Sequence, residues 1–521
     1  MNAIGETAFT VFGVLILAMS AGRAAAGQAP EPLGLVINED NSHFYFTRKP
    51  DDLNLDGLNA FVDQYADTQV THFFLCPNAM RTSYKSAVWD AIWELGSQAM
   101  PGGSAKAWFD NARILHERGL DPYAVWIARC REKGISPWLS MRMNDVHDVS
   151  NTTSFMHSTF WVDHPDYWRV PGSTGSWVDR AFDYGIPEVR EHHMRLVREL
   201  LERYDADGLE LDWMRFGYHF KPGAEKEGCA ILTDFMRQAR ALTQEWAAKR
   251  GHPIKLGARV PAHPDAAAGL GMDAVTWVQE GLVDMLVPTP FWTTSDFDIP
   301  MELWRERLGD GADGIVLAAG LEYNLRAYPS AATTPNDLAS MRGFAAASLH
   351  RGADQIYLFN HMDPGPDPDA SPDYRTLVEE GLGMEVATGA PRRHVVTFHD
   401  TVPPGMSNGV ALPADPQQGA SFHIYVGPAP EPGGRALFVA GLAKKDGVAD
   451  VALEVLVNGT ACTPIADGEN PGQYPGVVRA VRFECPLEAM KDGYNDAAVT
   501  QASGPAGQGI VWAEFEIHPA P

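Results

Sequence analysis

Two carboxylates, Glu210 and Asp212, lie two positions apart in the run 207–215 (Asp-Gly-Leu-Glu-Leu-Asp-Trp-Met-Arg), whose apolar residues predict a buried strand. A strand directs residues i and i+2 to the same side, so both acids face one way while Leu209 and Leu211 face the other. An ionised carboxylate is strongly unfavourable in an apolar interior unless it has partners. We interpret the pair as part of a catalytic site. The structural alternative is a salt bridge to an arginine: Arg142, Arg215 or Arg259.

Short apolar runs alternate with longer amphipathic stretches in the first three quarters of the chain. Eight of these runs read as strands: 33–38, 71–76, 135–142, 207–214, 254–260, 283–288, 314–320 and 354–360. The stretch 187–204 carries apolar residues at helical spacing and begins with Pro187. Helix followed by strand, repeated, implies parallel strands joined by right-handed crossovers. The pattern predicts an α/β fold, a (β/α)8 TIM barrel over 30–388, in preference to a doubly wound sheet.

The residue pattern changes after about residue 389, where Pro and Gly become frequent and short alternating runs replace helical periodicity. These runs are 395–399, 422–426, 436–441, 452–457, 477–483 and 509–517. They predict an all-β sandwich over 392–521, with 390–393 as the end of a linker. Asn458-Gly459 is typical of a two-residue hairpin turn.

The amino terminus predicts a secretory signal peptide over 1–26. An apolar run at 8–22 is followed by Arg23 and the small residues 24–27, and it is short for a membrane span of roughly 20 residues. We therefore expect a secreted, periplasmic or cell-envelope protein with no stable membrane span after cleavage. An uncleaved membrane anchor is the alternative.

The composition limits which classes of ligand and cofactor the protein is expected to bind. The net charge is -26 and the pI about 5.0, which disfavours nucleic acid because phosphate binding draws on clustered Lys and Arg. Cys462 and Cys485 are the candidates for a disulfide in an oxidising compartment. Cysteine spacing predicts no structural zinc site, and no nucleotide, flavin or haem motif is apparent, so we expect no cofactor.

A (β/α)8 barrel places its chemistry at the carboxyl ends of the strands, where unusual polar residues gather in this sequence. The candidate substrate-binding residues are Asn38, Asn78, Arg81, Arg142, Asn144, His147, Arg215, Arg259, Trp292 and Asn360. Carboxylates, amides and arginines suit vicinal hydroxyls, and flat aromatic rings suit the C–H faces of sugars. The aromatic candidates near the rim are Trp161, Trp168, Trp177, Trp213 and Trp292. The expected ligand is a poly- or oligosaccharide.

The segments 182–190 (Phe-Asp-Tyr-Gly-Ile-Pro-Glu-Val-Arg) and 203–212 (Arg-Tyr-Asp-Ala-Asp-Gly-Leu-Glu-Leu-Asp), with the helix between them, resemble glycoside-hydrolase-like family 10 proteins. In that family a Pro-Glu-Val-Arg helix leads to an Asp-Gly strand that bears acids. The resemblance implies a secreted or envelope (β/α)8 glycosidase-like domain of bacterial type. The chain departs from the commoner family ending, two adjacent Asp, by having Asp212-Trp-Met-Arg215.

We predict glycoside hydrolysis by two carboxylates, a general acid and a nucleophile or base. Asp212 lies ~6.6 Å further toward the mouth than Glu210 on a strand that rises ~3.3 Å per residue. Asp212 is therefore the first candidate, with Glu210 in support. Its expected partner is Glu322 at the end of the seventh strand, a placement that resembles the acid pairs of many retaining glycosidases. Asp145 and Asp363 are the reserves.

Two other readings remain open from the sequence. In one, Glu210 and Asp212 bind a divalent cation in a metal-dependent lyase or isomerase, with a third ligand from Asp145, His147 or Asp265. In the other, the barrel binds carbohydrate without catalysis. Nothing in the sequence predicts the oligomeric state, the sugar or the linkage.

Overall fold

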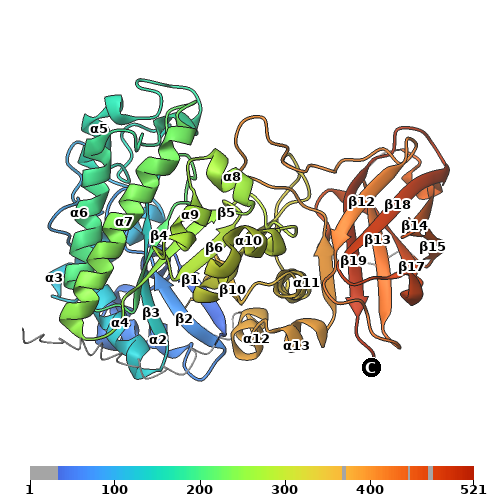
Figure 1. The fold of residues 1–521 in the computed structure, drawn as a ribbon, viewed down its shortest axis with the longest axis horizontal. Helices are drawn as coiled ribbons and strands as arrows, with labels where there is room; N and C mark the ends of the chain where they lie inside the picture. Colours follow the sequence, from blue (N-terminus) through green and yellow to red (C-terminus); the bar gives the residue numbers. More distant parts are fainter. Residues whose placement is uncertain (1–32, 366–370, 444–445, 467–472) are drawn as a thin grey trace, which may run out of the picture. The chain divides into compact units, whose positions relative to one another are not determined.

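The computed structural model describes residues 33–365, 371–443, 446–466 and 473–521 (Figure 1). Within it, eight strands close into a barrel in the order β1-β10-β7-β6-β5-β4-β3-β2, and neighbouring strands run parallel. Each coincides with one of the eight predicted strands, so the TIM-barrel prediction is confirmed. The strands are β1 (Leu35–Glu39), β2 (Val70–Leu75), β3 (Ser136–Arg142), β4 (Gly208–Asp212), β5 (Lys255–Pro261), β6 (Met285–Thr289), β7 (Val316–Glu322) and β10 (Gln355–Phe359).

Helices cover the outside of the barrel, and the long helices α6 and α7 run side by side along one flank of it in Figure 1. α6 spans Pro187–Arg203 as its spacing predicts, with Val189, Leu196 and Leu200 buried. The helices are α1 (His43–Thr47), α2 (Leu55–Asp63), α3 (Ala105–Glu117), α4 (Pro122–Glu132), α5 (Thr159–Asp163), α6, α7 (Glu225–Arg250), α8 (Pro264–Gly269), α9 (Ala274–Gln279), α10 (Met301–Leu308), α11 (Leu338–His350), α12 (Pro372–Glu380) and α13 (Met384–Thr388). A small ribbon, β8 (Asn324–Leu325) with β9 (Thr334–Pro335), follows β7.

Apolar side chains fill the barrel interior below its mouth. They form one buried cluster: Val36, Phe74, Trp138, Met285, Val287, Ala318, Tyr357 and Phe359. Gly208 leaves room for the largest of them, because a Cβ at that position would lie 2.3 Å from the Trp138 indole. The glycine of the Asp-Gly motif is therefore a packing requirement, and it lets β4 carry its two acids past the indole.

The C-terminal region is a sandwich of two antiparallel sheets, as predicted, ordered β11-β19-β13-β17-β16 and β12-β18-β14-β15. Val457 pairs with Thr460 across the predicted Asn458-Gly459 turn, where both turn residues have positive φ, 51° and 85°. The strands are β11 (Arg392–Val395), β12 (Ala420–Tyr425), β13 (Arg435–Ala443), β14 (Ala452–Val457), β15 (Thr460–Ala461), β16 (Thr463–Pro464), β17 (Val477–Cys485), β18 (Tyr494–Ser503) and β19 (Ile510–His518).

Two local features of this region differ from the sequence prediction. The expected linker end at 390–393 belongs to strand β11, which the sequence analysis had placed at 395–399. The buried Arg393 of this strand donates to the buried Glu514 at 2.8 Å. Because an inward position holds a charged residue, the local pattern did not read as a strand. Strand β18 was missed because its inward positions include Asn495 and Ala497, which give little apolar alternation. The sequence left open whether Cys462 and Cys485 are bridged; in the structure their thiols are free and in hydrogen-bond contact.

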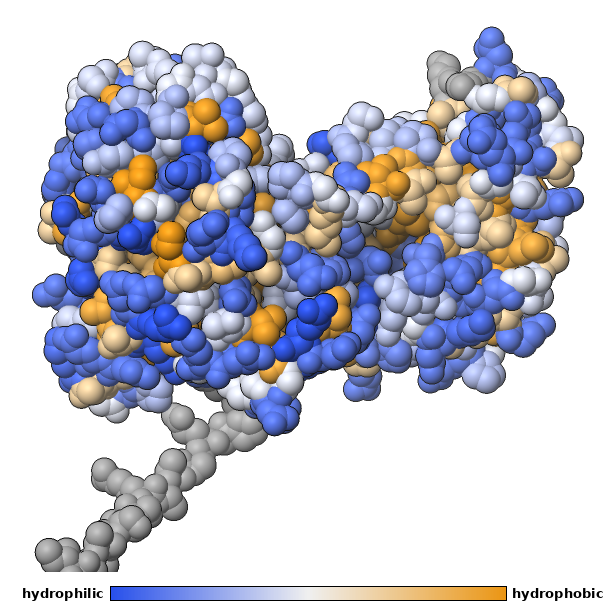
Figure 2. Space-filling view, turned by 45° about the horizontal axis from the view of Figure 1, so that its top comes forward, coloured by the Kyte–Doolittle hydropathy of each residue, from blue (hydrophilic) through white to orange (hydrophobic). Residues whose placement is uncertain are grey.

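The predicted signal peptide at 1–26 lies outside the described residues. Within the described part of the chain, no helix is both long enough and apolar enough to cross a membrane. Hydrophilic residues cover most of the face drawn in Figure 2, and the broadest apolar area on that face lies at the right of the view.

Candidate active site

The barrel register turns the acids of β4 toward the interior. Glu210 lies beside Ser140 of β3, and Asp212 lies between Arg142 of β3 and Arg259 of β5. Neighbouring residues in register share a face of the sheet, so these side chains meet at the carboxyl end of the barrel. The predicted grouping of Glu210 and Asp212 with Arg142 and Arg259 is present.

Asp212 is buried and paired with Arg259, whose Nη1 donates to Oδ2 at 2.7 Å. The backbone N–H groups of Met214 and Arg215 donate to Oδ1 at 3.0 and 2.8 Å. The Arg259 guanidinium lies 3.7 Å from the centre of the Phe359 ring. The structural salt bridge that the sequence left as an alternative therefore exists, and it fixes Asp212 as the paired carboxylate of the mouth.

Glu210 lies below Asp212 in a hydrogen-bond network. Its Oε1 accepts from the Ser140 hydroxyl at 2.6 Å, from the Tyr357 hydroxyl at 2.9 Å and from the Asn38 amide at 3.4 Å. Burial and the neighbouring Asp212 charge raise the pKa of Glu210. Asn38 therefore holds Glu210 in place and is not a substrate ligand of the rim.

Glu322 ends β7 beside Phe359 of the interior cluster, so its side chain also faces inward. The Asn360 amide lies 2.9 Å from both carboxyl oxygens. Burial raises the pKa of Glu322 to about 8, against the lowering effect of Asn360, Arg215 and Arg259. Asn360 has φ 62°, a conformation uncommon outside glycine. In this conformation its side-chain amide contacts the Glu322 carboxyl group.

A charged network joins the mouth to the loop after β3. Arg142 contacts Asp40 and donates to Asp145 at 3.4 Å. His147 donates from Nδ1 to Asp145 at 2.8 Å and accepts from Arg215 at Nε2, 3.0 Å away. Burial raises the pKa of Asp145, but His147 and Arg142 outweigh it and hold the pKa below its usual value. Asp145 is thus a paired carboxylate that orients His147.

A cavity of about 560 Å³ at the mouth is lined by the loops after β3, β4 and β6. Trp177 and Trp292 line it and are 38% and 46% exposed. Phe291 stacks on Trp177 with ring centroids 5.6 Å apart. Phe216 contacts both Trp177 and Phe291, and its φ of 69° is a strained conformation for an aromatic residue. Exposed flat rings around a polar floor are the surfaces that bind sugar faces.

Several predicted residues do not reach the mouth. The Asn78 amide donates to the backbone of Arg142 at 3.0 Å, and the Asn144 amide donates to the backbone of Phe182 at 3.0 Å. The Arg81 guanidinium is fully buried and donates to loop carbonyls such as that of His157 at 2.8 Å. These three side chains hold loops. Among the predicted aromatic rim, three tryptophans are core residues instead: Trp161, Trp168 and Trp213.

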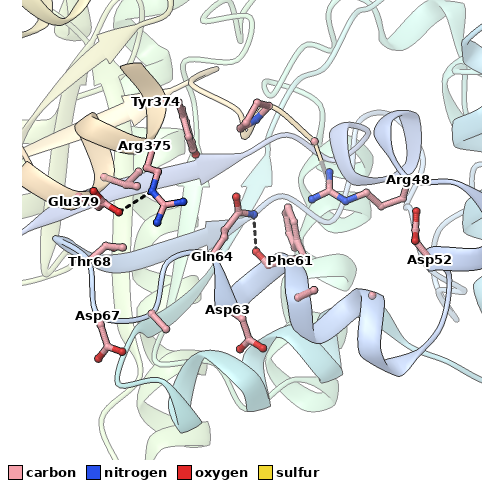
Figure 3. Close-up of a pocket in the computed structure, with 16 residues that line it drawn as sticks. Arg48, Asp52, Phe61, Asp63, Gln64, Asp67, Thr68, Tyr374, Arg375 and Glu379 are labelled. Carbon is pink, nitrogen blue, oxygen red and sulfur yellow. Dashed lines mark hydrogen bonds and ion pairs between the residues drawn. The ribbon is translucent and has the colours of Figure 1, made fainter. Parts of the chain in front are cut away.

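Asp363, the reserve candidate for the second catalytic acid, is not grouped with the acids of the barrel mouth. It accepts from Arg48 at 2.6 Å and from Gln64 at 2.6 Å, beside a cavity of about 690 Å³ between α2 and α12. Figure 3 shows Arg48, Gln64 and Tyr374 on the walls of this cavity, on the outer side of the barrel. Its ion pairs make Asp363 a structural residue.

Sequence reasoning missed Glu39, a buried glutamate that ends β1 one residue beyond the predicted strand. Neither of its carboxyl oxygens has a hydrogen-bond partner among the described residues. Burial raises the pKa of Glu39 from 4.5 to about 8, although the nearby His43 lowers it. The folded chain therefore keeps this proton after the unfolded chain has lost it.

We expect Glu39→Gln to stabilise the fold at high pH. The parent loses stability as pH rises from about 4.5 to about 8, because only the folded state still binds the proton. At pH 8.5 the free energy of unfolding of the variant should exceed that of the parent by about 4–5 kcal/mol, and at pH 5 by less than about 1 kcal/mol. Urea unfolding at both pH values measures this, with the exposed Glu431→Gln as control. Equal differences at the two pH values would contradict it.

Asp400, also missed, shapes the aromatic cavity from beyond strand β11. Its carboxylate accepts from three consecutive backbone N–H groups of the β6 loop, those of Phe291, Trp292 and Thr293, at 2.8, 3.0 and 2.9 Å. No local sequence signal connects residues that are 107 to 109 positions apart. Asp400 thus positions the loop that carries Trp292.

Asp400→Ala should free these three amides. We expect their hydrogen exchange to accelerate about tenfold or more, because each loses its acceptor. Exchange measured by mass spectrometry on peptides that span the β6 loop tests this. Asp415→Ala is the matched control, since Asp415 accepts from Gln417 in an exposed turn. Unchanged exchange in the β6 loop would show that Asp400 does not hold it.

Within the described residues, no group of three or more His, Cys, Asp or Glu side chains is arranged to hold a metal ion.

Sequence comparison connects part of the chain to a known family. The sequence model of the glycosyl hydrolase-like 10 family matches residues 76–255. Glycosyl hydrolase DigH of Escherichia coli (strain K12) is 23% identical over 263 residues, which cover 40% of this chain and 57% of DigH. The chain thus spans little more than half the length of this relative.

Solved structures with a similar arrangement are distant. The PgaB (BpsB) glycoside hydrolase domain from Bordetella bronchiseptica has a TM-score of 0.41 at 11% identity, covering 68% of this chain and 99% of that one. Alpha-L-fucosidase isoenzyme 2 from Paenibacillus thiaminolyticus has a TM-score of 0.40 at 13% identity, covering 66% and 48%. The family match contains the predicted stretch 182–215, so over 76–255, which includes Glu210 and Asp212, this chain is similar to glycosyl hydrolase-like 10 proteins.

Proposed function

We propose that the barrel mouth hydrolyses O-glycosidic bonds, with Glu322 as proton donor and Asp212 as the charged carboxylate. The observation that carries the proposal is the contrast between the two acids. Burial favours the protonated form of Glu322, while Asp212 is paired with Arg259. Glycoside hydrolysis requires such a division, one carboxyl that gives a proton and one that bears charge.

In the proposed reaction, Glu322 protonates the glycosidic oxygen as the bond to the anomeric carbon breaks. The positive charge that develops on the sugar is met by the Asp212 carboxylate, as nucleophile or as base for the water that replaces the leaving group. Glu210 supports Asp212 from below. Trp177 and Trp292 present flat surfaces to the sugar ring, and Arg215 contributes donors at the cavity wall.

The match to glycosyl hydrolase-like 10 proteins over 76–255 supports this proposal. By the same reasoning, carbohydrate is the proposed ligand, and the amino-terminal pattern supports a secreted, periplasmic or envelope location. The metal-dependent and the purely binding alternatives predict different behaviour of the same site, so one experiment separates them.

The test is turnover of aryl glycosides and oligosaccharides by the purified chain, with and without chelator. Asp212→Asn and Glu322→Gln are compared with the exposed Glu431→Gln. The proposal expects hydrolysis that ignores chelator, disappears in both mouth variants and persists in the control. Activity that chelator abolishes would favour the metal-dependent reading. Saccharide binding without turnover, unchanged in both mouth variants, would favour a non-catalytic barrel.

A further inference from the structure

The chain passes from one sheet of the sandwich to the other at Cys462. β15 pairs with β14 in the four-stranded sheet, and β16 pairs with β17 in the five-stranded sheet. Cys462 is the single residue between β15 and β16, and its backbone N–H donates to the Val455 carbonyl of β14 at 2.9 Å. Among the described strands, β15 and β16 are both short edge strands that pair on one side only, so few backbone hydrogen bonds hold this corner.

The register of the edge strands places Cys485 opposite Cys462. Thr463 of β16 pairs antiparallel with Glu484 of β17. The next pair in the same register is therefore Cys462 with Cys485, the last residue of β17. Residues directly opposite each other in an antiparallel pair present their side chains on the same face of the sheet. Accordingly, the two thiols are in hydrogen-bond contact.

The spacing of this pair suits a disulfide bond. The backbone N–H of Ile465 donates to the Arg482 carbonyl at 3.0 Å, so these two residues form a hydrogen-bonded pair. Hydrogen-bonded and non-hydrogen-bonded pairs alternate along an antiparallel ladder, so Cys462 and Cys485 form a non-hydrogen-bonded pair. The Cα atoms of such a pair lie about 4.5 Å apart, within the span of about 4.4–6.8 Å that a disulfide bridges. The two sulfurs are thus placed to bond without a shift of either strand.

The two thiols differ in access to solvent and in acidity. Cys485 is 2% exposed, and its hydrogen bond to Cys462, together with burial, raises the pKa of its thiol. Cys462 is half-buried, and the hydrogen bond that it receives from Cys485 lowers the pKa of its thiol. The thiolate is the nucleophile in thiol–disulfide exchange, so Cys462 is the thiol that reacts first.

We propose that Cys462 and Cys485 are a modification site, at which a disulfide closes the corner between the two sheets of the sandwich. The oxidant is a small-molecule disulfide of an oxidising compartment. The Cys462 thiolate attacks one sulfur of the oxidant and releases the other as a thiolate. The Cys485 sulfur then attacks the Cys462 sulfur, and its proton passes to the second thiolate that leaves. Two protein thiols are oxidised to one disulfide, and one small disulfide is reduced to two thiols.

Incubation of the purified chain with oxidised glutathione tests whether the bond forms. Free thiols are then alkylated in denaturant, and the protein is digested without reduction. Mass spectrometry is expected to find the peptides of Cys462 and Cys485 joined, two hydrogens lighter than the two separate peptides. Recovery of both residues as alkylated thiols would overturn the proposal. Glutathione retained on Cys462, with Cys485 still alkylated, would overturn it as well.

Serine variants test the order of the two steps. In Cys485→Ser the mixed disulfide has no second thiol to resolve it, so glutathione should remain on Cys462. In Cys462→Ser the buried Cys485 should stay reduced. Cys229→Ser is the matched control, since Cys229 is a half-buried cysteine of α7 whose thiol contacts the Ala268 carbonyl at 3.4 Å, and the joined peptide should form in it as in the parent. Equally fast glutathionylation of the two single variants would overturn the assignment of Cys462 as the attacking thiol.

Hydrogen exchange tests whether the bond holds the corner. The amides of Cys462 and Ile465 donate across the two edges, to Val455 and Arg482. We expect them to exchange about tenfold more slowly in the oxidised protein than in protein reduced with dithiothreitol, because the tie opposes opening of the edge strands. The difference should disappear in Cys462→Ser. Equal exchange in oxidised and reduced parent protein, with the joined peptide present, would overturn the proposed closure of the corner.

Discussion

Glu322→Gln is expected to reduce hydrolysis of ordinary glycosides by roughly a thousandfold, within the range of general acid catalysis. Glutamine keeps the shape and the contact with Asn360 but has no proton to give. The loss should be far smaller for a dinitrophenyl glycoside, whose leaving group departs without protonation. The rates at which the parent, Glu322→Gln and the control Glu431→Gln hydrolyse both types of substrate measure the difference between the two losses.

The pH profile gives an independent check on the same residue. Burial raises the pKa of Glu322 to about 8, so the proton donor is present at neutral pH. Turnover of ordinary glycosides by the parent should fall as pH rises through about 8, because deprotonated Glu322 cannot act as the acid. If Glu322→Gln loses both substrate types equally, Glu322 is not the proton donor.

Arg259→Met is expected to destabilise the fold by about 3–5 kcal/mol, the range for removing one partner of a buried ion pair. Both side chains are fully buried, and the bond between them is 2.7 Å long. Methionine fills much of the space beside Phe359 but leaves the Asp212 carboxylate with only its two backbone donors. Urea unfolding at pH 7 measures the loss.

The double variant Arg259→Met with Asp212→Asn provides the control. Because it removes the unpaired charge, it should recover most of the stability while remaining inactive. Additive losses from the two single variants would show that the pair contributes little. A stable single variant, Arg259→Met, would mean that Asp212 finds another partner in the mouth.

The sequence alone predicted the architecture. Period-two and helical patterns are local consequences of which face of each element is buried, so the eight barrel strands and α6 could be read within one or two residues. Where an inward position held a charged or small residue, the local pattern failed. The charged Arg393 occupies a buried position of β11, and the small Ala497 occupies a buried position of β18, so neither strand showed a clear alternation of apolar residues.

For the site, the sequence predicted that Glu210, Asp212 and Glu322 face the barrel interior, since strand alternation fixes that direction. It could not distinguish Arg259, which pairs with Asp212, from Arg81, whose fully buried guanidinium binds loop carbonyls. Both arginines follow a strand, and only the path of the loops decides what each one contacts.

What the tertiary structure alone decided is the environment of each group. The raised pKa of Glu322 is caused by burial, and the exposure of Trp177 and Trp292 against the burial of Trp161 and Trp213 depends on loop packing. Asp400 reaches the β6 loop across more than a hundred residues of sequence. The sequence determined the barrel and its inward acids because those follow from local periodicity. The division of roles among the acids, and the walls of both cavities, arise from contacts between segments that are distant in the chain.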